Sequence, residues 1–263
     1  MGTAILSGLL ASGFPSEKVT ITTKSAESAK KLSDELGVTA IALENQPTAN
    51  QDAVVGADVV LVAVKPAYVV EVLKEAANKL HENATVISVA AGITTAAMEA
   101  AVPASVAVIR SMPNTPAIVG RAVTGVSTGS RVTEEQLENA LELFETVGRV
   151  VVLPESQIDA LSTISGSGPA YVFYLIEQLT EAAQNMGFGE DIAAMLVEET
   201  FAGATELLSA SNQNPTDLRR QVTSPNGTTM QAVAVMEQAE LSKLFTKATE
   251  AALARAKEIA AGK

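Results

Sequence analysis

Residues 58–66 have the sequence DVVLVAVKP, in which six apolar residues run without interruption between Asp58 and Lys65. A strand of this composition is typical of a parallel sheet that helices cover, so we expect both faces of this strand to be buried. On either side of it, short β-branched runs alternate with helical patterns as far as residue 153. This alternation predicts βαβ units, and therefore an α/β fold with a mostly parallel sheet.

The predicted elements extend this pattern towards both ends of the chain. Strands are expected at residues 19–22, 39–43, 58–64, 85–90, 105–110, 122–127 and 149–153, with helices at 25–36, 67–80, 95–101 and 134–146. After Pro154 only helical periodicity remains, over residues 170–186, 190–210, 216–222, 228–238 and 241–260. We therefore predict an α/β domain at residues 1–154 and an all-helical domain at residues 155–263.

The long helices of the second domain are rich in alanine and carry few large side chains. Such helices are too sparse to close a hydrophobic core alone, and exchange of helices between two copies is a natural solution. We therefore expect a homodimer.

The composition excludes several classes of protein. A net charge of −12 disfavours nucleic acid or an anionic membrane surface as the main partner. The absence of cysteine excludes disulfides, thiolate catalysis and cysteine-bound metals, and no metal site is predicted. No apolar run reaches the ~18 residues of a membrane span, and no targeting segment is recognisable, which favours a cytoplasmic enzyme. The single histidine, His81, has polar neighbours and is interpreted as a solvated helix end rather than a general acid.

The first residues bear on nucleotide binding. In a Rossmann-like domain the first strand leads through a G-x-G-x-x-G turn into a helix whose positive end faces the pyrophosphate. Here a helix follows Met1 directly, and only Gly2 can correspond to the last glycine of that turn. Taken alone, these residues favour an ordinary N-terminal helix.

The turn after the strand at 19–22 contains three hydroxyls and one cation, from Thr22, Thr23, Lys24 and Ser25. An acid that would take the ribose 2′-hydroxyl of NADH is absent from this turn. The turn therefore suits the 2′-phosphate of NADPH. The alternative is a solvated turn with a serine helix cap.

Three successive strands of the predicted sheet end in unusual loops. These are VKP at 64–66, AAG at 90–92 and SMPNTP at 111–116. Open α/β sheets bind ligands at the carboxyl ends of their strands. The sequence therefore predicts a ligand site at this edge of the sheet.

Two glycine-containing segments precede helices in the second half, SGSGP at 165–169 and SPNGTT at 224–229. Unpaired backbone N–H groups, a helix dipole and several hydroxyls make the second segment a suitable cradle for a carboxylate. Two well-capped helices are an equally good interpretation of the residues alone.

Together these segments resemble pyrroline-5-carboxylate reductases. The sequences AVKP at 63–66, MPNTPA at 112–117, SGSGPAY at 165–171 and SPNGTT at 224–229 stand in that family's order and spacing, and the resemblance covers essentially the whole chain. It implies reduction of Δ1-pyrroline-5-carboxylate to L-proline, the last step of proline biosynthesis, with NADPH or NADH. It also implies dimers with interlocked C-terminal helices, often assembled into decamers.

The resemblance further assigns residues to sites. The implied cofactor site consists of Gly2, Thr22, Thr23, Lys24, Asn50, Ala63, Val64, Lys65, Pro66, Ala91, Gly92 and Asn114. The implied substrate site consists of Ser224, Asn226, Gly227, Thr228 and Thr229, and the hydroxyl of Thr229 is the catalytic group that contacts the ring nitrogen.

Three departures from the family pattern are notable. Asn226 and Ala122 stand where glycine is common, and we expect Asn226 to adopt a positive φ. The first strand and the first two glycines of the cofactor turn are absent, so we expect about ten residues ahead of Met1 and weak cofactor binding by the chain as given.

The reaction implied needs no strong acid, because a protonated imine accepts hydride when it is positioned over the nicotinamide.

Two alternative functions remain. A β-hydroxyacid dehydrogenase would need a catalytic lysine on the helix after Pro169. That helix begins AYVFYL, which contains no lysine, and this counts against the alternative. A non-catalytic dimerisation protein that has lost its cofactor site is the second.

Overall fold

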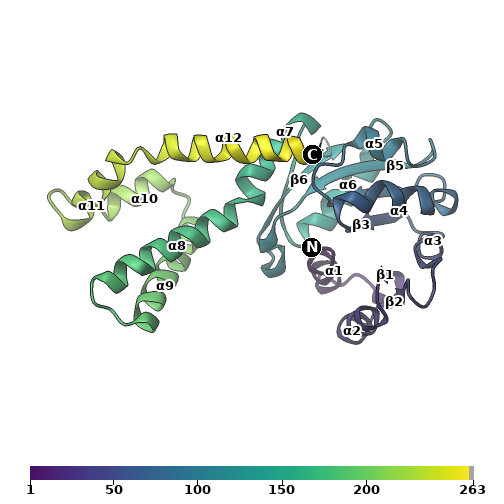
Figure 1. Cartoon of the computed structure of the whole chain (residues 1–263), viewed down its shortest axis with the longest axis horizontal. Helices are drawn as coiled ribbons and strands as arrows, with labels where there is room; N and C mark the ends of the chain where they lie inside the picture. Colours follow the sequence, from purple (N-terminus) through teal and green to yellow (C-terminus); the bar gives the residue numbers. More distant parts are fainter. Residues whose placement is uncertain (261–263) are drawn as a thin grey trace. The chain divides into compact units, whose positions relative to one another are not determined.

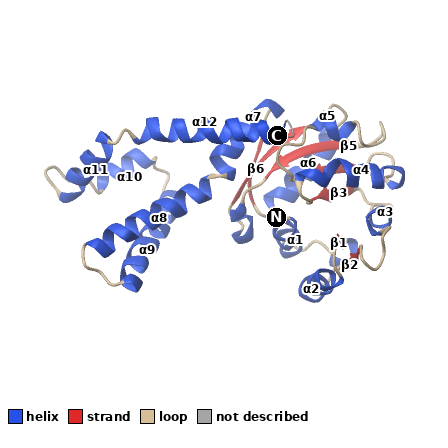
Figure 2. Ribbon diagram, in the orientation of Figure 1, coloured by secondary structure: helices blue, strands red, loops and turns tan. Residues whose placement is uncertain are grey.

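The computed structural model describes residues 1–260 of the chain (Figures 1 and 2). They form two compact units. Unit 1 is Met1–Ser167 together with the chain from Ala252 onward, and unit 2 is Gly168–Ala251. The residues just after Pro154 therefore belong to the same compact unit as the sheets. The domain boundary at Pro154 stays a prediction.

Unit 1 contains two sheets. In the smaller sheet, β1 (Thr20–Thr23) and β2 (Thr39–Ala42) are parallel. In the larger sheet the strand order follows the chain, with β3, β4 and β5 parallel, β6 antiparallel to β5, and β7 parallel to β6. The bounds are β3 (Val59–Val62), β4 (Thr85–Ser88), β5 (Ala107–Met112), β6 (Ala122–Thr128) and β7 (Gly148–Val152). The predicted α/β class with a mostly parallel sheet is confirmed.

Helices alternate with these strands, and local sequence explains their ends. The hydroxyl of Ser25 accepts the N–H of Ser28 at the start of α2, and Gly37 ends that helix in the left-handed conformation. Thr133 and Gln136 form a capping box at the start of α6. The α-helices of unit 1 are α1 (Gly2–Ala11), α2 (Ala26–Leu36), α3 (Ala49–Ala53), α4 (Val69–Ala76), α5 (Thr95–Glu99), α6 (Glu134–Glu145) and α7 (Glu155–Leu161), followed by π-helical η5 (Ser162–Gly166). Short 3₁₀ turns are η1 (Ser16–Lys18), η2 (Pro66–Tyr68), η3 (Ala77–Lys79) and η4 (Thr115–Val119).

The larger sheet is covered on both faces. Val86 and Val108 belong to one buried cluster, which includes residues of α4 and α5. Ile87 and Ile109, the next residues along β4 and β5, belong to a second cluster with α1 and α6. Alternate residues of a strand point to opposite faces, so β4 and β5 form the centre of a three-layer core. The fully buried Phe144 of α6 contributes roughly 1.5–3 kcal/mol to this core.

The expectation that the run at 58–64 is buried on both faces is wrong. Val59 of β3 is 39% exposed, and only Val62 in this strand is buried, whereas β4 is buried throughout. The reason is position, because β3 is the edge strand of its sheet and has a hydrogen-bonded neighbour on one side only.

The two sheets are separate. Within residues 1–260 no ladder of hydrogen bonds joins β1 to β3.

Unit 2 is helical, as predicted. Its helices are α8 (Gly168–Asn185), α9 (Glu190–Ala210), α10 (Pro215–Gln221), α11 (Thr228–Gln238) and the first part of α12 (Leu241–Ala260). Ala193 and Val197 are the buried apolar residues among the described residues of this unit. Large apolar side chains such as Phe173, Leu207 and Val235 are more than half exposed. The helices of unit 2 therefore leave apolar faces uncovered.

Candidate active site

The larger sheet brings the three predicted strand-end loops to one edge. Since β3, β4 and β5 are neighbours and parallel, their carboxyl ends lie together. The loop with Ala63, Val64, Lys65 and Pro66 follows β3, the loop with Ala91 and Gly92 follows β4, and the loop with Asn114 follows β5. Their placement on one edge agrees with the prediction, and their contact with a cofactor stays a prediction.

Gly2 lies against the first of these loops. A Cβ atom added to Gly2 would be 2.9 Å from the Cβ of Ala63, closer than side chains normally approach. The start of α1 and the loop after β3 are therefore in contact, and only glycine fits between them. This puts the positive end of a ten-residue helix beside the strand ends.

The turn after β1 joins several predicted residues. The hydroxyl of Thr22 donates to the side-chain oxygen of Asn50 at 2.8 Å, which ties the turn to α3. The hydroxyl of Thr23 donates to the carbonyl of Ser25 at 2.9 Å. Lys24 is exposed, so its ammonium group is free to meet an anion at the surface.

An acid from the turn after β2 lies against the turn after β1. The carboxylate of Glu44 accepts the backbone N–H of Ala26, the first residue of α2, at 2.6 Å, and the N–H of Glu44 donates to the carbonyl of Lys24 at 3.2 Å. Glu44 was not predicted from the sequence as part of this site. The signal was available in the parallel register, because Thr23 pairs with Ala42 and the residues that follow each strand must also be neighbours.

Asn114 is buried and its side chain is engaged within unit 1. Its amide nitrogen donates to the carbonyl of Ser165 at 2.9 Å, and its amide oxygen accepts the N–H of Val123 at 2.9 Å. Asn114 thus fixes the loop after β5 to the π-helical turn before α8. Its assignment as a cofactor ligand stays a prediction.

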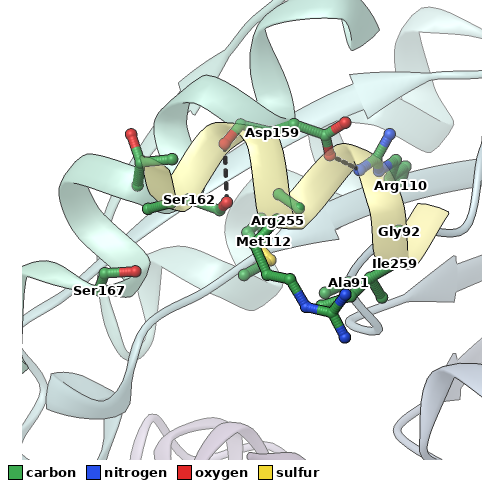
Figure 3. Close-up of a pocket in the computed structure, with 12 residues that line it drawn as sticks. Ala91, Gly92, Arg110, Met112, Asp159, Ser162, Ser167, Arg255 and Ile259 are labelled. Atoms are coloured by element: carbon green, nitrogen blue, oxygen red, sulfur yellow. Dashed lines mark hydrogen bonds and ion pairs between the residues drawn. The ribbon is translucent and has the colours of Figure 1, made fainter. Parts of the chain in front are cut away.

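A pocket of about 300 Å³ opens beside the strand ends in unit 1 (Figure 3). It is lined by Ala91 and Gly92 after β4, by Met112 at the end of β5, and by residues of α12 from Ala252 onward. Gly92 has a φ of +76°, and a Cβ atom there would be 3.4 Å from the Cα of Ala260. The absence of a side chain at Gly92 therefore lets the end of α12 approach the loop after β4 closely.

A group of charged residues borders the same pocket and was not predicted from the sequence. The guanidinium of Arg110, on β5, forms ion pairs with Glu155 and Asp159, which lie one turn apart on α7. Its side chain is only 5% exposed. Among residues 1–260, no cluster of acids and histidine is placed to hold a metal ion.

The predicted substrate loop lies in unit 2. Asn226 has a φ of 59°, which confirms the expected positive φ, and the N–H of Gly227 donates to the carbonyl of Ser224 at 3.0 Å to close a turn. Thr228 and Thr229 then begin α11, for which no described side chain serves as a cap. The first N–H groups of a helix have no intrahelical partner, so this loop presents donors for an anion beside the partly exposed Thr229.

No helix within residues 1–260 combines the length and apolar character needed to cross a membrane.

Comparisons with known proteins agree with this arrangement. Residues 1–92 match the family described as "NADP oxidoreductase coenzyme F420-dependent", and residues 155–259 match "Pyrroline-5-carboxylate reductase dimerisation". A pyrroline-5-carboxylate reductase of Corynebacterium melassecola is 38% identical over 98% of this chain and 95% of its own length.

Solved structures give the same result. A pyrroline-5-carboxylate reductase from Coxiella burnetii has a TM-score of 0.91 and 36% identity, and the match covers 98% of this chain and 94% of that one. A pyrroline carboxylate reductase of Plasmodium falciparum with NADP bound shares the fold at 24% identity, with a TM-score of 0.82 over 99% of this chain and 94% of that one. By its similarity to curated relatives over nearly its whole length, the chain belongs to the pyrroline-5-carboxylate reductase family.

Proposed function

We propose that the chain reduces Δ1-pyrroline-5-carboxylate to L-proline with a nicotinamide cofactor. The observation that carries the proposal is the loop at 224–229, whose turn at Asn226 presents the start of α11 and the hydroxyl of Thr229. Family membership supplies the substrate, and the loop offers what that substrate requires, namely N–H donors for a carboxylate and a hydroxyl for the ring nitrogen.

The residues of unit 1 suit a dinucleotide. The start of α1 at Gly2 offers N–H groups to a pyrophosphate, and the exposed Lys24 offers a charge to the adenosine side. The hydroxyls of Thr22 and Thr23 hold the turn in place through their own hydrogen bonds. Ala91 and Gly92 allow a flat ring to approach the end of β4. When bound, the cofactor supplies the hydride that the carbon of the C=N bond accepts.

The chain's own residues then have two tasks. The loop at 224–229 holds the carboxylate and so fixes the orientation of the ring, and the hydroxyl of Thr229 forms a hydrogen bond with the ring nitrogen as its charge changes. No histidine or cysteine is needed, because the imine nitrogen carries its proton before the hydride arrives.

The direct test is to follow oxidation of NADPH by the purified chain in the presence of Δ1-pyrroline-5-carboxylate and to identify proline as the product. Turnover that depends on both compounds is expected. A folded chain that binds the cofactor but gives no proline would refute the proposal.

The apolar faces of unit 2 support a homodimer as the smallest assembly, and decamers would be multiples of it. The match of residues 155–259 to a dimerisation family supports the same proposal. Sedimentation velocity at micromolar concentration is expected to show a dimer or a multiple of a dimer. The reason is that association would bury exposed apolar side chains such as Phe173, Leu207 and Val235. A stable monomer with native helix content would contradict this. The cytoplasmic location predicted from the sequence stays a prediction.

A further inference from the structure

Glu155 holds the start of α5 with both of its carboxylate oxygens. One oxygen accepts the backbone N–H of Thr95 at 2.7 Å, and the other accepts the hydroxyl of Thr95 at 2.8 Å. Thr95 is the first residue of α5 and comes three residues after Gly92. The loop between β4 and α5 is therefore fastened at its far end by a residue of α7.

Arg110 holds the carboxylate of Glu155 in place. Its guanidinium contacts Glu155 at 3.5 Å. It also pairs with Asp159, one turn further along α7, as Figure 3 shows. Because Arg110 is almost wholly buried while the two acids are about one-quarter exposed, the cation depends on both of them for its compensation. The pair of acids thus docks α7 on β5 in one orientation.

The ion pairs of Arg110 border the same pocket as the loop between β4 and α5. Arg110 and Asp159 line the same pocket as Ala91 and Gly92. A shift of Thr95 would be transmitted through the short segment 92–95 to the place where the nicotinamide ring is proposed to lie. Hydride transfer depends on placing the reacting groups to within a fraction of an ångström. A loop that contacts the cofactor contributes to this placement.

We propose that Glu155 is a positioning residue for the reductase reaction, which acts through Thr95 by holding the Ala91–Gly92 loop against the cofactor. The proposal rests on the proposed function. It assigns Glu155 a specific effect on turnover, in addition to its contribution to stability.

The chain offers a matched control at the other end of α5. The carboxylate of Glu99 accepts the backbone N–H of Ser130 at 2.6 Å and the hydroxyl of Ser130 at 2.9 Å, which is the same pair of bonds. Ser130 follows β6, which is antiparallel to β5, so this bridge lies at the edge of the sheet away from the strand ends of the site. Loss of such a bridge should affect stability in both places but turnover in only one.

The experiment compares Glu155→Gln with Glu99→Gln in steady-state reduction and in thermal unfolding. Glu155→Gln is expected to lower kcat about fivefold, the scale of one or two weakened hydrogen bonds, with the KM for Δ1-pyrroline-5-carboxylate within about twofold of the wild-type value. Glu99→Gln should leave kcat unchanged and lower the melting temperature by less than Glu155→Gln does, because Glu155 also compensates the buried Arg110. Equal losses of kcat in the two variants, or an unchanged kcat in Glu155→Gln, would overturn the proposal.

A second pair of variants covers failure of Glu155→Gln to fold. Thr95→Val keeps the shape and the N–H but loses the hydroxyl bond, whereas Thr95→Ser keeps both bonds to Glu155. We expect kcat to fall about threefold in Thr95→Val and to return to the wild-type value in Thr95→Ser. Equal activity in both variants would refute the role of the bridge. A wild-type chain without reductase activity would instead refute the proposed function itself.

Discussion

Replacement of Thr229 by alanine is expected to lower kcat/KM for Δ1-pyrroline-5-carboxylate by about tenfold or more, because one hydrogen bond to a group whose charge changes is lost. Thr229 is the second residue of α11, directly after the turn at Asn226 and Gly227. Its partly exposed side chain stands beside the first N–H groups of that helix. Steady-state kinetics with both substrates varied will measure the change.

The affinity for NADPH should stay close to the wild-type value in this variant. Thr229 belongs to unit 2, whereas the residues proposed to hold the cofactor belong to unit 1. Thr229→Ser keeps the hydroxyl and serves as the matched control, with activity expected near that of the wild type. Unchanged turnover in Thr229→Ala would remove Thr229 from the mechanism, and an equal loss in Thr229→Ser would indicate a packing effect of the methyl group.

Features encoded by neighbouring residues were predictable from the sequence. The helices at 190–210, 228–238 and 241–260 have the predicted bounds, because the apolar periodicity that predicts each helix lies within its own segment. The positive φ of Asn226 was also predictable, because the family that the chain resembles commonly has glycine at this position and asparagine tolerates that conformation. The order of strand-end loops followed from alternation of strands and helices.

Features that depend on distant residues were not predictable in the same way. The run at 58–64 has the composition of a central strand, but β3 is an edge strand, and composition does not specify how many neighbours a strand has. Glu155 and Thr95 are sixty residues apart, and nothing in either local sequence indicates the other. Their contact depends on how α7 packs against β5, through Arg110.

Glu44 shows how one missed residue affects a functional prediction. The turn at Thr22–Ser25 lacks an acid in sequence, which favours NADPH, yet the carboxylate of Glu44 lies at the first N–H of α2. A negative charge at that position competes with a phosphate for the same helix end. The preference between NADPH and NADH therefore depends on the balance between Lys24 and Glu44.

We propose that Lys24 prevails and that NADPH is the preferred cofactor, with NADH also accepted. Lys24→Glu is expected to weaken binding of NADPH about tenfold to hundredfold more than binding of NADH. A charge-assisted hydrogen bond contributes about 1.5–3 kcal/mol, and every 1.4 kcal/mol corresponds to about tenfold in affinity. The variant also places a second acid beside Glu44, which repels the 2′-phosphate but has little effect on a ribose hydroxyl.

Glu44→Gln provides the opposite change at the same turn. It removes a negative charge while keeping an oxygen that accepts the N–H of Ala26, so α2 retains its first hydrogen bond. NADPH should then bind more tightly by about threefold, with the affinity for NADH nearly unchanged. Both variants are best titrated with each cofactor at one fixed ionic strength, because Lys24 and Glu44 are exposed and their charges are screened by salt. If either substitution changed the affinities for NADPH and NADH by the same factor, the turn after β1 would not contact the 2′-phosphate. Selectivity between the two cofactors would then have to come from another part of the cofactor site.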